Sequence, residues 1–310
     1  MGQRELWDGF FATHLGGGRR ARALFLRAGA ETRHGVANPL VEDVSGWSTG
    51  RRMRRYAAEA LPLGKGAVAD ALAEAGLTAG DVGLLAVCSC TGYVTPGLDI
   101  LLARDLGMPP DVRRLFVGHM GCYAALPGLA AVSDYVSRHG RAAVLLCVEL
   151  TSLHIQPATD EPDQVVSHAL FSDAAAAVVV TPAHGEAAPG HGEGCGLEVR
   201  DVACRTEFAA ADHMTWEVTD LGFRMGLSPR VPDVLAGQLA PAVADLLRPH
   251  GLSVSDVDGW AVHPGGPRIL DVTRQALDLP ADALAASRDV LARHGNCSSA
   301  TVLVVLRELA

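Results

Sequence analysis

One stretch of the chain occurs twice. Residues 67–88, AVADALAEAGLTAGDVGLLAVC, align without a gap on residues 242–263, AVADLLRPHGLSVSDVDGWAVH, and half of the aligned positions are identical. Each copy predicts a helix that ends at a glycine, then a short loop and a buried strand. Two copies are too few for a solenoid. The repeat therefore predicts two similar α/β halves packed against each other.

The boundary between the halves is predicted at the segment TPAHGEAAPGHGEG, which is rich in turn-forming residues. It places the first half at residues 1–182 and the second at residues 195–310. His184 and His191 in this segment are expected to belong to an exposed linker rather than to a metal site. The second half begins with a predicted strand, GLEVRDVAC, whereas RELWDGFFATHL in the first half predicts an amphipathic helix. The first sheet is therefore expected to lack its first strand.

Composition narrows the class of protein. The chain has 310 residues, 49% of them apolar, which is enough for a large core. A formal net charge of −9 argues against a protein that coats nucleic acid or anionic membranes. The N-terminus has no signal-peptide pattern and no apolar run is long enough to cross a bilayer. A cytoplasmic protein is expected, with the odd number of cysteines reduced: Cys88, Cys90, Cys122, Cys147, Cys195, Cys204 and Cys297.

Three polar residues stand out against apolar surroundings. Cys122 follows a glycine in LFVGHMGCYAAL, at a predicted strand-to-helix junction, and Asn296 lies in RHGNCSSATVLVVL. His263 ends the second copy of the repeat, at the carboxyl end of a predicted strand, where ligands bind in α/β sheets. Taken singly, such residues are more often a packed thiol, a core histidine and a turn residue. Together they suit acyl transfer through a thioester, because an imidazole activates a thiol and an amide stabilises an oxyanion.

Five segments resemble one family. GHMGCYAALPGL, ALFSDAAAAVVV, WAVHPGGPRILD, HGNCSSATVLVVL and CSCTGYVTPGLDILLARDLG are similar to the signature blocks of type III polyketide synthases, the chalcone and stilbene synthase family. The resemblance extends from Glu5 to the C-terminus. It implies a thiolase-like α/β fold, with two duplicated halves in a layered α-β-α-β-α arrangement, and a homodimer. Relatives carry an extra N-terminal strand, so this chain is expected to start late.

Other members of the thiolase superfamily remain as alternatives. A β-ketoacyl-carrier-protein synthase III also uses cysteine, histidine and asparagine, although HPGGP and GNCSS are more similar to the polyketide synthase pattern. A hydroxymethylglutaryl-CoA synthase needs an acidic partner near Cys122, and that segment contains none. The third alternative is a non-catalytic thiolase-fold homologue, which has no need to retain all three polar residues.

The resemblance implies a role for each residue of the site. Cys122 is expected to take the starter acyl group from an acyl-CoA. His263 and Asn296 are expected to hold the thioester oxygen of malonyl-CoA as it loses CO₂. The thioester supplies the activation, so the resemblance implies no nicotinamide, flavin or metal cofactor.

Further residues are assigned by their place in the family pattern. Phe171 and Phe223 match two gatekeeper phenylalanines between a CoA tunnel and the product cavity. His154 and Met214 are bulkier than their counterparts in plant chalcone synthases, which argues against an unmodified chalcone synthase cavity. A pyrone, a resorcinol and a small polyhydroxyarene fit the sequence equally well. The residues expected to line the cavity are Thr95, His154, Met214 and Ser298, and those expected to bind the phosphates of CoA are Arg27, Arg33 and Arg268.

Overall fold

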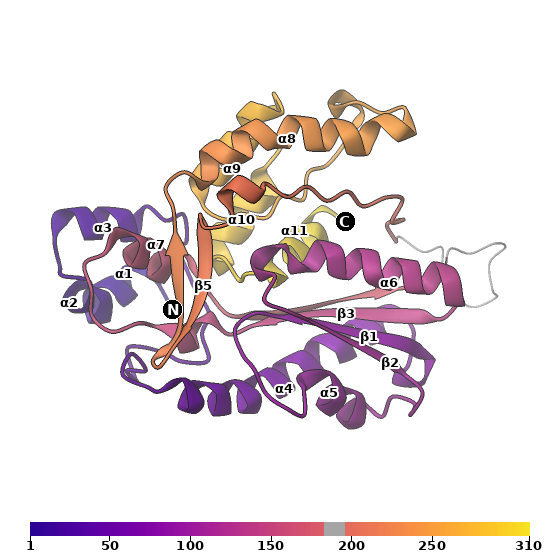
Figure 1. Cartoon of the computed structure of the whole chain (residues 1–310), viewed down its shortest axis with the longest axis horizontal. Helices are drawn as coiled ribbons and strands as arrows, with labels where there is room; N and C mark the ends of the chain where they lie inside the picture. The colour runs from indigo at the N-terminus through magenta and orange to yellow at the C-terminus, as the bar shows by residue number, and fades with distance from the viewer. Residues whose placement is uncertain (183–195) are drawn as a thin grey trace.

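The computed structural model describes residues 1–182 and 196–310, with a four-stranded sheet at its centre (Figure 1). The strands follow the order β2-β1-β3-β4, and β1 pairs in parallel with both β2 and β3, whereas β4 runs antiparallel to β3. Their bounds are β1 Val82–Ser89, β2 Arg113–Gly118, β3 Ala142–Glu149 and β4 Ala174–Val180. A separate hairpin consists of β5, Met214–Thr219, and β6, Gly222–Leu227. The predicted linker histidines His184 and His191, and Cys195, lie outside the described residues.

Helices cover both faces of the sheet. α4 and α5 lie on one face, α6 and α11 lie on the other, and α8 and α9 lie beyond that second layer (Figure 1). The helix bounds are α1 Gln3–Leu6, α2 Ala12–His14, α3 Arg19–Leu26, α4 Thr49–Glu74, α5 Leu98–Leu106, α6 Ala125–His139, α7 Pro162–Leu170, α8 Val231–Leu247, α9 Pro267–Ala276, α10 Ala285–His294 and α11 Ala300–Leu309. None of the helices in the described ranges combines the length and hydrophobicity needed to cross a bilayer.

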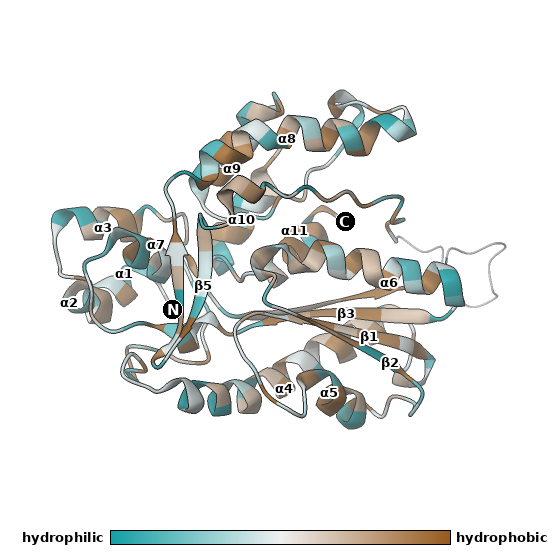
Figure 2. Ribbon diagram, in the orientation of Figure 1, coloured by the Kyte–Doolittle hydropathy of each residue, from teal (hydrophilic) through white to brown (hydrophobic). Residues whose placement is uncertain are grey.

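The two inner strands are buried on both faces, which explains their continuous apolar sequences. Every residue of β1 and of β3 is buried. Because side chains alternate along a strand, Leu85 and Val87 face the α4 layer, whereas Leu84 and Ala86 face the α6 and α11 layer. The hydropathy colouring shows the same apolar band along these strands (Figure 2). β1 and β3 pair directly, so their backbone groups are satisfied within the described sheet.

The repeat is preserved in structure up to its final strand. In both copies a glycine with positive φ follows the helix, Gly76 at 66° and Gly251 at 69°. In both copies a capping box then closes a 3-10 turn, with Thr78 paired to Asp81 and a serine–aspartate pair in the second copy. The helix and the loop that the repeat predicts are therefore confirmed in each half.

The strands predicted in the second half are wrong. Within the described chain, residues 196–204 and 257–263 belong to no β-ladder. A strand is stable only where a neighbour pairs with it, and residues 196–204 are mostly exposed. In the second segment, the N–H of Val262 instead donates to Ser287 Oγ at 3.2 Å, and that hydroxyl donates to the Val262 carbonyl at 2.7 Å. A side chain of α10 thus replaces a neighbouring strand.

The predicted N-terminal helix is confirmed, with one irregularity. α1 and α2 are joined by a π-helical turn over Trp7–Phe11, and the three pieces form one continuous helical segment. Leu6, Trp7 and Phe11 are buried on its inner face. This face packs against Phe25 of α3, with the Trp7 and Phe25 ring centroids 5.2 Å apart.

Candidate active site

Cys122 lies at the junction of β2 and α6. It occupies a 3-10 turn, Gly121–Ala124, that leads directly into α6. The backbone reverses just before it, since His119 has a φ of 60° and Gly121 a φ of 63°. Glycine adopts this left-handed conformation without strain, which explains the glycine ahead of the thiol. The structure confirms the predicted strand-to-helix junction.

The structure brings Asn296 to this thiol. The Sγ of Cys122 lies 4.0 Å from Asn296 Oδ1, a long and weak hydrogen bond from the thiol. The backbone of Asn296 forms an isolated parallel bridge with Phe171: its N–H donates to the Leu170 carbonyl at 2.8 Å, and its carbonyl accepts from Ser172 N at 2.9 Å. Two residues far apart in the sequence therefore meet beside the predicted gatekeeper.

The orientation of the Asn296 amide is fixed by the backbone. The N–H of Ser298 donates to Asn296 Oδ1 at 2.9 Å, and Ser298 itself has a φ of 50°. Because a backbone donor already occupies the oxygen, the amide nitrogen is the end of the side chain that is left to donate to a ligand. Ser298, which was predicted to line the cavity, is buried next to the thiol.

The thiol of Cys122 is protonated at neutral pH. Burial raises its pKa to about 11, while hydrogen bonds with Ser298 and Asn296 act in the opposite direction. For this thiol to act as a nucleophile, a nearby base would have to take up its proton.

Alkylation of Cys122 by iodoacetamide is expected to accelerate by about tenfold for each pH unit from about pH 7 to pH 10, because only the thiolate reacts and its fraction rises with pH below the pKa. Mass spectrometry of the Cys122 peptide measures this rate, and the exposed thiol of Cys204 in the same digest serves as the reference. A rate that levels off below pH 7 contradicts the protonated thiol and indicates a pre-formed ion pair with an imidazolium.

The side chain of His263 is partly exposed, but both of its ring nitrogens are buried. Within the described residues neither ring nitrogen has a hydrogen-bond partner, and burial lowers its pKa to about 4, so the ring is neutral. It therefore makes no hydrogen bond to Cys122 here. The loop that follows His263 packs against Leu170 through Gly266. A Cβ atom added to Gly266 would lie 3.7 Å from Leu170 Cδ2. Leu170 is the residue whose carbonyl accepts from Asn296.

Sequence reasoning missed a buried carboxylate, Glu149 at the end of β3. Its oxygens accept from Cys90 N at 3.0 Å, Thr91 Oγ1 at 2.8 Å and Ser299 Oγ at 2.6 Å. Burial raises its pKa in spite of these hydrogen bonds. It also accepts from Ser298 Oγ at 3.4 Å, so an acidic group does lie near the thiol, although it comes from a different segment. The only signal in the sequence was a glutamate that ends an apolar run.

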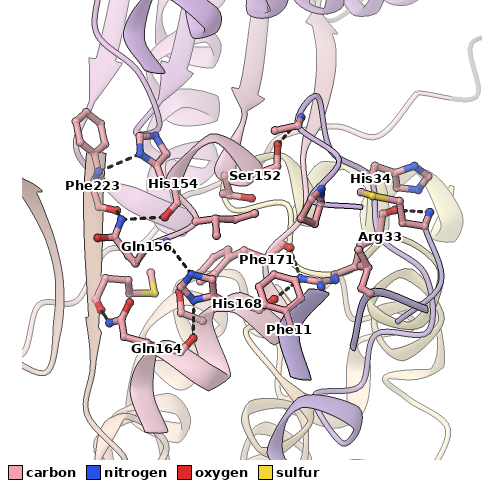
Figure 3. A pocket seen from close by; sticks show the side chains of 18 of the residues that line it. Phe11, Arg33, His34, Ser152, His154, Gln156, Gln164, His168, Phe171 and Phe223 are labelled. Carbon is pink, nitrogen blue, oxygen red and sulfur yellow. Dashed lines mark hydrogen bonds between the residues drawn. The ribbon is translucent and has the colours of Figure 1, made fainter. Parts of the chain in front are cut away.

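A cavity adjoins the bridge between Phe171 and Asn296 (Figure 3). Both predicted gatekeepers, Phe171 and Phe223, line it, and so does His154. Its volume is about 50 Å³, which is far below the ~300 Å³ or more of typical ligand sites. The cavity must therefore widen to admit a substrate. The three predicted catalytic residues do not line it.

The side chain of His154 lines this cavity. Its imidazole ring is neutral, and both ring nitrogens are hydrogen-bonded. Its Nε2 donates to the Thr91 carbonyl at 2.7 Å, and its Nδ1 accepts from Phe223 N at 3.0 Å. The imidazole stacks on the Phe223 ring with centroids 4.5 Å apart, and burial lowers its pKa to about 4. The other predicted cavity residues lie elsewhere: Met214 is half exposed on β5, and Thr95 is exposed.

The three predicted CoA-binding arginines differ in environment. Arg27 is exposed after α3, and Arg268 is exposed at the start of α9 in an ion pair of 3.0 Å with Asp233. Arg33, in contrast, is only 5% exposed. The structure therefore does not place Arg33 on a solvent-facing rim, because its guanidinium lies among buried rings and carbonyl groups.

No group of three or more metal-ligating side chains occurs within the described residues.

The fold and the site together define an α/β protein with a cysteine-centred site at the carboxyl edge of its sheet. The chain belongs to the chalcone and stilbene synthase family: the N-terminal domain of chalcone and stilbene synthases matches residues 36–183, and the C-terminal domain matches residues 203–310. The family predicted from the sequence, and the thiolase-like α/β fold that it implies, are confirmed.

Two curated relatives illustrate the similarity. The chain is 34% identical over 264 residues to the alpha-pyrone synthesis polyketide synthase-like Pks18 of Mycobacterium tuberculosis, covering 83% of this chain and 65% of that protein. It is 38% identical over 292 residues to the 1,3,6,8-tetrahydroxynaphthalene synthase of Streptomyces peucetius subsp. caesius, covering 93% and 75%. The chain thus spans slightly less than two thirds of the length of Pks18.

Solved structures agree with the family. The 1,3,6,8-tetrahydroxynaphthalene synthase of Streptomyces coelicolor, a bacterial type III polyketide synthase, superposes with a TM-score of 0.90 at 28% identity, over 100% of this chain and 86% of that one. PKS-I from the brown alga Ectocarpus siliculosus superposes with a TM-score of 0.83 at 28% identity, over 94% and 79%.

Proposed function

We propose that this chain condenses malonyl-CoA with an acyl-CoA starter through repeated decarboxylation and then cyclises the product. One observation carries the proposal: Cys122 Sγ lies 4.0 Å from Asn296 Oδ1, and Asn296 is bridged to Phe171 at the edge of the cavity. A backbone bridge thus joins the amide donor to an apolar wall, and the proposed nucleophile contacts that amide.

In the loading step, Cys122 attacks the thioester carbonyl of the acyl-CoA. The thiol proton passes to the neutral imidazole of His263, a carbon–sulfur bond to the enzyme forms, and the bond to CoA breaks. CoA leaves as its thiol after taking up that proton. The imidazole of His263 is neutral at pH 7 because burial lowers its pKa, so a ring nitrogen is free of a proton and can accept this one.

In the extension step, malonyl-CoA loses CO₂. The carbon–carbon bond to the carboxylate breaks, and its electron pair forms an enolate whose oxygen accepts from the Asn296 amide nitrogen and from His263. The enolate carbon then attacks the acyl group on Cys122 and releases the sulfur. The apolar ring of Phe171 disfavours a charged carboxylate and so favours its loss. No electron is exchanged with a redox partner, which supports a reaction without a cofactor.

The product is proposed to be small. His154, which lines the cavity and stacks on Phe223, is bulkier than its counterpart in plant chalcone synthases. The names of the relatives, an alpha-pyrone synthesis enzyme and a tetrahydroxynaphthalene synthase, support a pyrone or a small polyhydroxyarene, with a resorcinol as a third product of similar size.

A homodimer in the cytoplasm completes the proposal. β2 is an edge strand of the sheet, and apolar side chains around it and the start of α6 are 38–44% exposed: Leu115, Phe116, Met120, Tyr123 and Leu126. Such a patch on an open edge is suited to a second copy of the chain. The cysteines of the described residues are free thiols, which suits a reducing compartment.

Phe116→Glu is expected to convert a dimer into a monomer, because a charge in the centre of the patch must lose its water at the interface. Light scattering on the eluting peak of a gel-filtration column measures the mass. Leu252→Glu, at a comparably exposed leucine in the second half, is the matched control and is expected to leave the dimer intact. A monomeric wild type, or a dimeric Phe116→Glu variant, contradicts the homodimer.

Incubation with radiolabelled malonyl-CoA and a panel of acyl-CoA starters tests the activity. Acyl groups trapped on Cys122 and a released labelled polyketide are expected. Absence of both, with every starter, favours a non-catalytic thiolase-fold homologue. A strict requirement for malonyl carrier protein in place of malonyl-CoA favours a β-ketoacyl-carrier-protein synthase III. The mass of the released product distinguishes the three product classes.

A further inference from the structure

Arg33 is a buried cation whose side chain is hydrogen-bonded to the C-terminal end of α7. Its Nη1 donates to the carbonyl oxygens of His168 and Phe171, at the C-terminal end of α7 (Figure 3). The last carbonyl groups of a helix have no partner within the helix, and a positive charge there is favourable. The guanidinium thus satisfies carbonyl groups immediately beside the predicted gatekeeper.

Two aromatic rings hold the rest of the guanidinium. Its Cζ lies 5.7 Å from the centroid of the Phe11 ring and 5.3 Å from that of Phe25. Nε and Nη2 find no hydrogen-bond partner among the described residues, so the rings stabilise this part of the charge. Burial lowers the pKa of Arg33 to about 9, which leaves it charged at neutral pH.

The same side chain touches the other side of the bridge. A Cβ added to Gly295, which has a φ of 73°, would lie 3.2 Å from Arg33 Cγ and 3.0 Å from the Leu170 carbonyl oxygen. Gly295 immediately precedes Asn296. Arg33 therefore contacts both segments that the bridge between Phe171 and Asn296 joins.

The residues after Arg33 extend this contact along the chain. The N–H of His34 donates to Ser172 Oγ at 2.7 Å, and its carbonyl accepts from Asp173 N at 3.0 Å. The N–H of Val36 donates to Asp173 Oδ2 at 2.8 Å. Residues 33–36 thus run along residues 171–173 and fix their position from the side opposite to Asn296.

We propose that Arg33 is a positioning residue that holds the Phe171–Asn296 bridge, and so places the Asn296 amide and the Phe171 ring for decarboxylation. The part of this inference that concerns decarboxylation rests on the proposed function. Arg33 acts through the bridge and has no contact with Cys122 among those described. Loss of its hydrogen bonds therefore affects the extension step more than the loading step.

The test compares Arg33→Met, which retains much of the apolar contact with the rings but no donor, with Arg33→Lys, which retains the charge and one donor group. Arg52→Met is the matched control: Arg52 is fully buried and donates to the carbonyls of Leu153 and Ile155, away from the bridge. Release of CO₂ from malonyl-CoA and the acylation of Cys122 by a starter are measured separately.

Arg33→Met is expected to slow decarboxylation by about 100-fold, the effect of a displacement of about 1 Å at a reacting group, while acylation changes by less than about threefold. Arg33→Lys is expected to recover about tenfold of that loss. Arg52→Met is expected to change both steps in equal proportion. An equal fall of both steps in Arg33→Met, or no fall in decarboxylation, overturns the positioning role.

Hydrogen exchange separates this inference from the proposed function. The amides of Ser172 and Asn296, which form the bridge, are expected to exchange at least about tenfold faster in Arg33→Met than in the wild type, and to be unchanged in Arg52→Met. Faster exchange in a protein without condensing activity retains the structural role and rejects only the function. Unchanged exchange rejects the inference whatever the activity.

Discussion

Cys122→Ala is expected to lower polyketide formation by at least about 1,000-fold, because no acyl-enzyme can form without the sulfur. The release of CO₂ from malonyl-CoA is expected to continue, since His263 and Asn296 remain. The variant is expected to fold, because Cys122 is only partly buried and its hydrogen bond to Asn296 is long and weak. Product mass spectrometry and a CO₂ assay on the same preparation measure the two activities.

Cys204→Ala is the matched control, since this thiol is exposed and has no part in the proposed reaction. It is expected to retain the wild-type rate of product formation. Polyketide formation at the wild-type rate by Cys122→Ala contradicts the role of this thiol. If CO₂ release stops together with product formation, the two steps are not separable in the way proposed.

His263→Leu is expected to lower decarboxylation by about 100- to 10,000-fold, the usual contribution of a positioned acid–base group. Replacement of a buried polar side chain usually lowers the free energy of unfolding, but His263→Leu is not expected to do so. Both ring nitrogens of His263 are buried without a partner within the described chain, so an apolar side chain of similar size removes an unpaired polar group. The free energy of unfolding is expected to stay equal or to rise.

His154→Leu provides the contrast. Its two nitrogens are bonded to the backbone of Thr91 and Phe223, so the substitution leaves those groups unsatisfied and is expected to cost about 1–3 kcal/mol. Urea denaturation of both variants measures the two free energies. A large loss of stability in His263→Leu, equal to that in His154→Leu, contradicts the view that the free imidazole of His263 is reserved for a ligand.

The helix and loop of the repeat were predictable because their signals are local. A glycine after each helix and a capping pair in each loop act within a few residues, and both copies keep them. The strand that follows was predictable only in the first half. A strand depends on partners distant in the sequence, and β1 has two of them, whereas residues 257–263 have none in the described chain.

The candidate site also combines features that local motifs predict with features that depend on residues distant in the sequence. The residues around Cys122 and Asn296 carry motifs, and the structure brings the pair together. Glu149 was missed because it ends a strand of apolar residues, where a carboxylate has no pattern of its own. Arg33 was assigned to CoA binding by its place in the family pattern, and the sequence carried no signal for its burial. Its burial depends on Phe11 and Phe25, which come from other helices.

The bond between Ser298 N–H and Asn296 Oδ1 has a consequence for the energy of the reaction. The amide cannot turn over without breaking a backbone hydrogen bond, so its dipole is aligned before any substrate enters. Water would have to reorient around a developing negative charge, whereas this dipole is already aimed. In the proposed reaction, that reorganisation cost would be met once, during folding, and not again in each catalytic cycle.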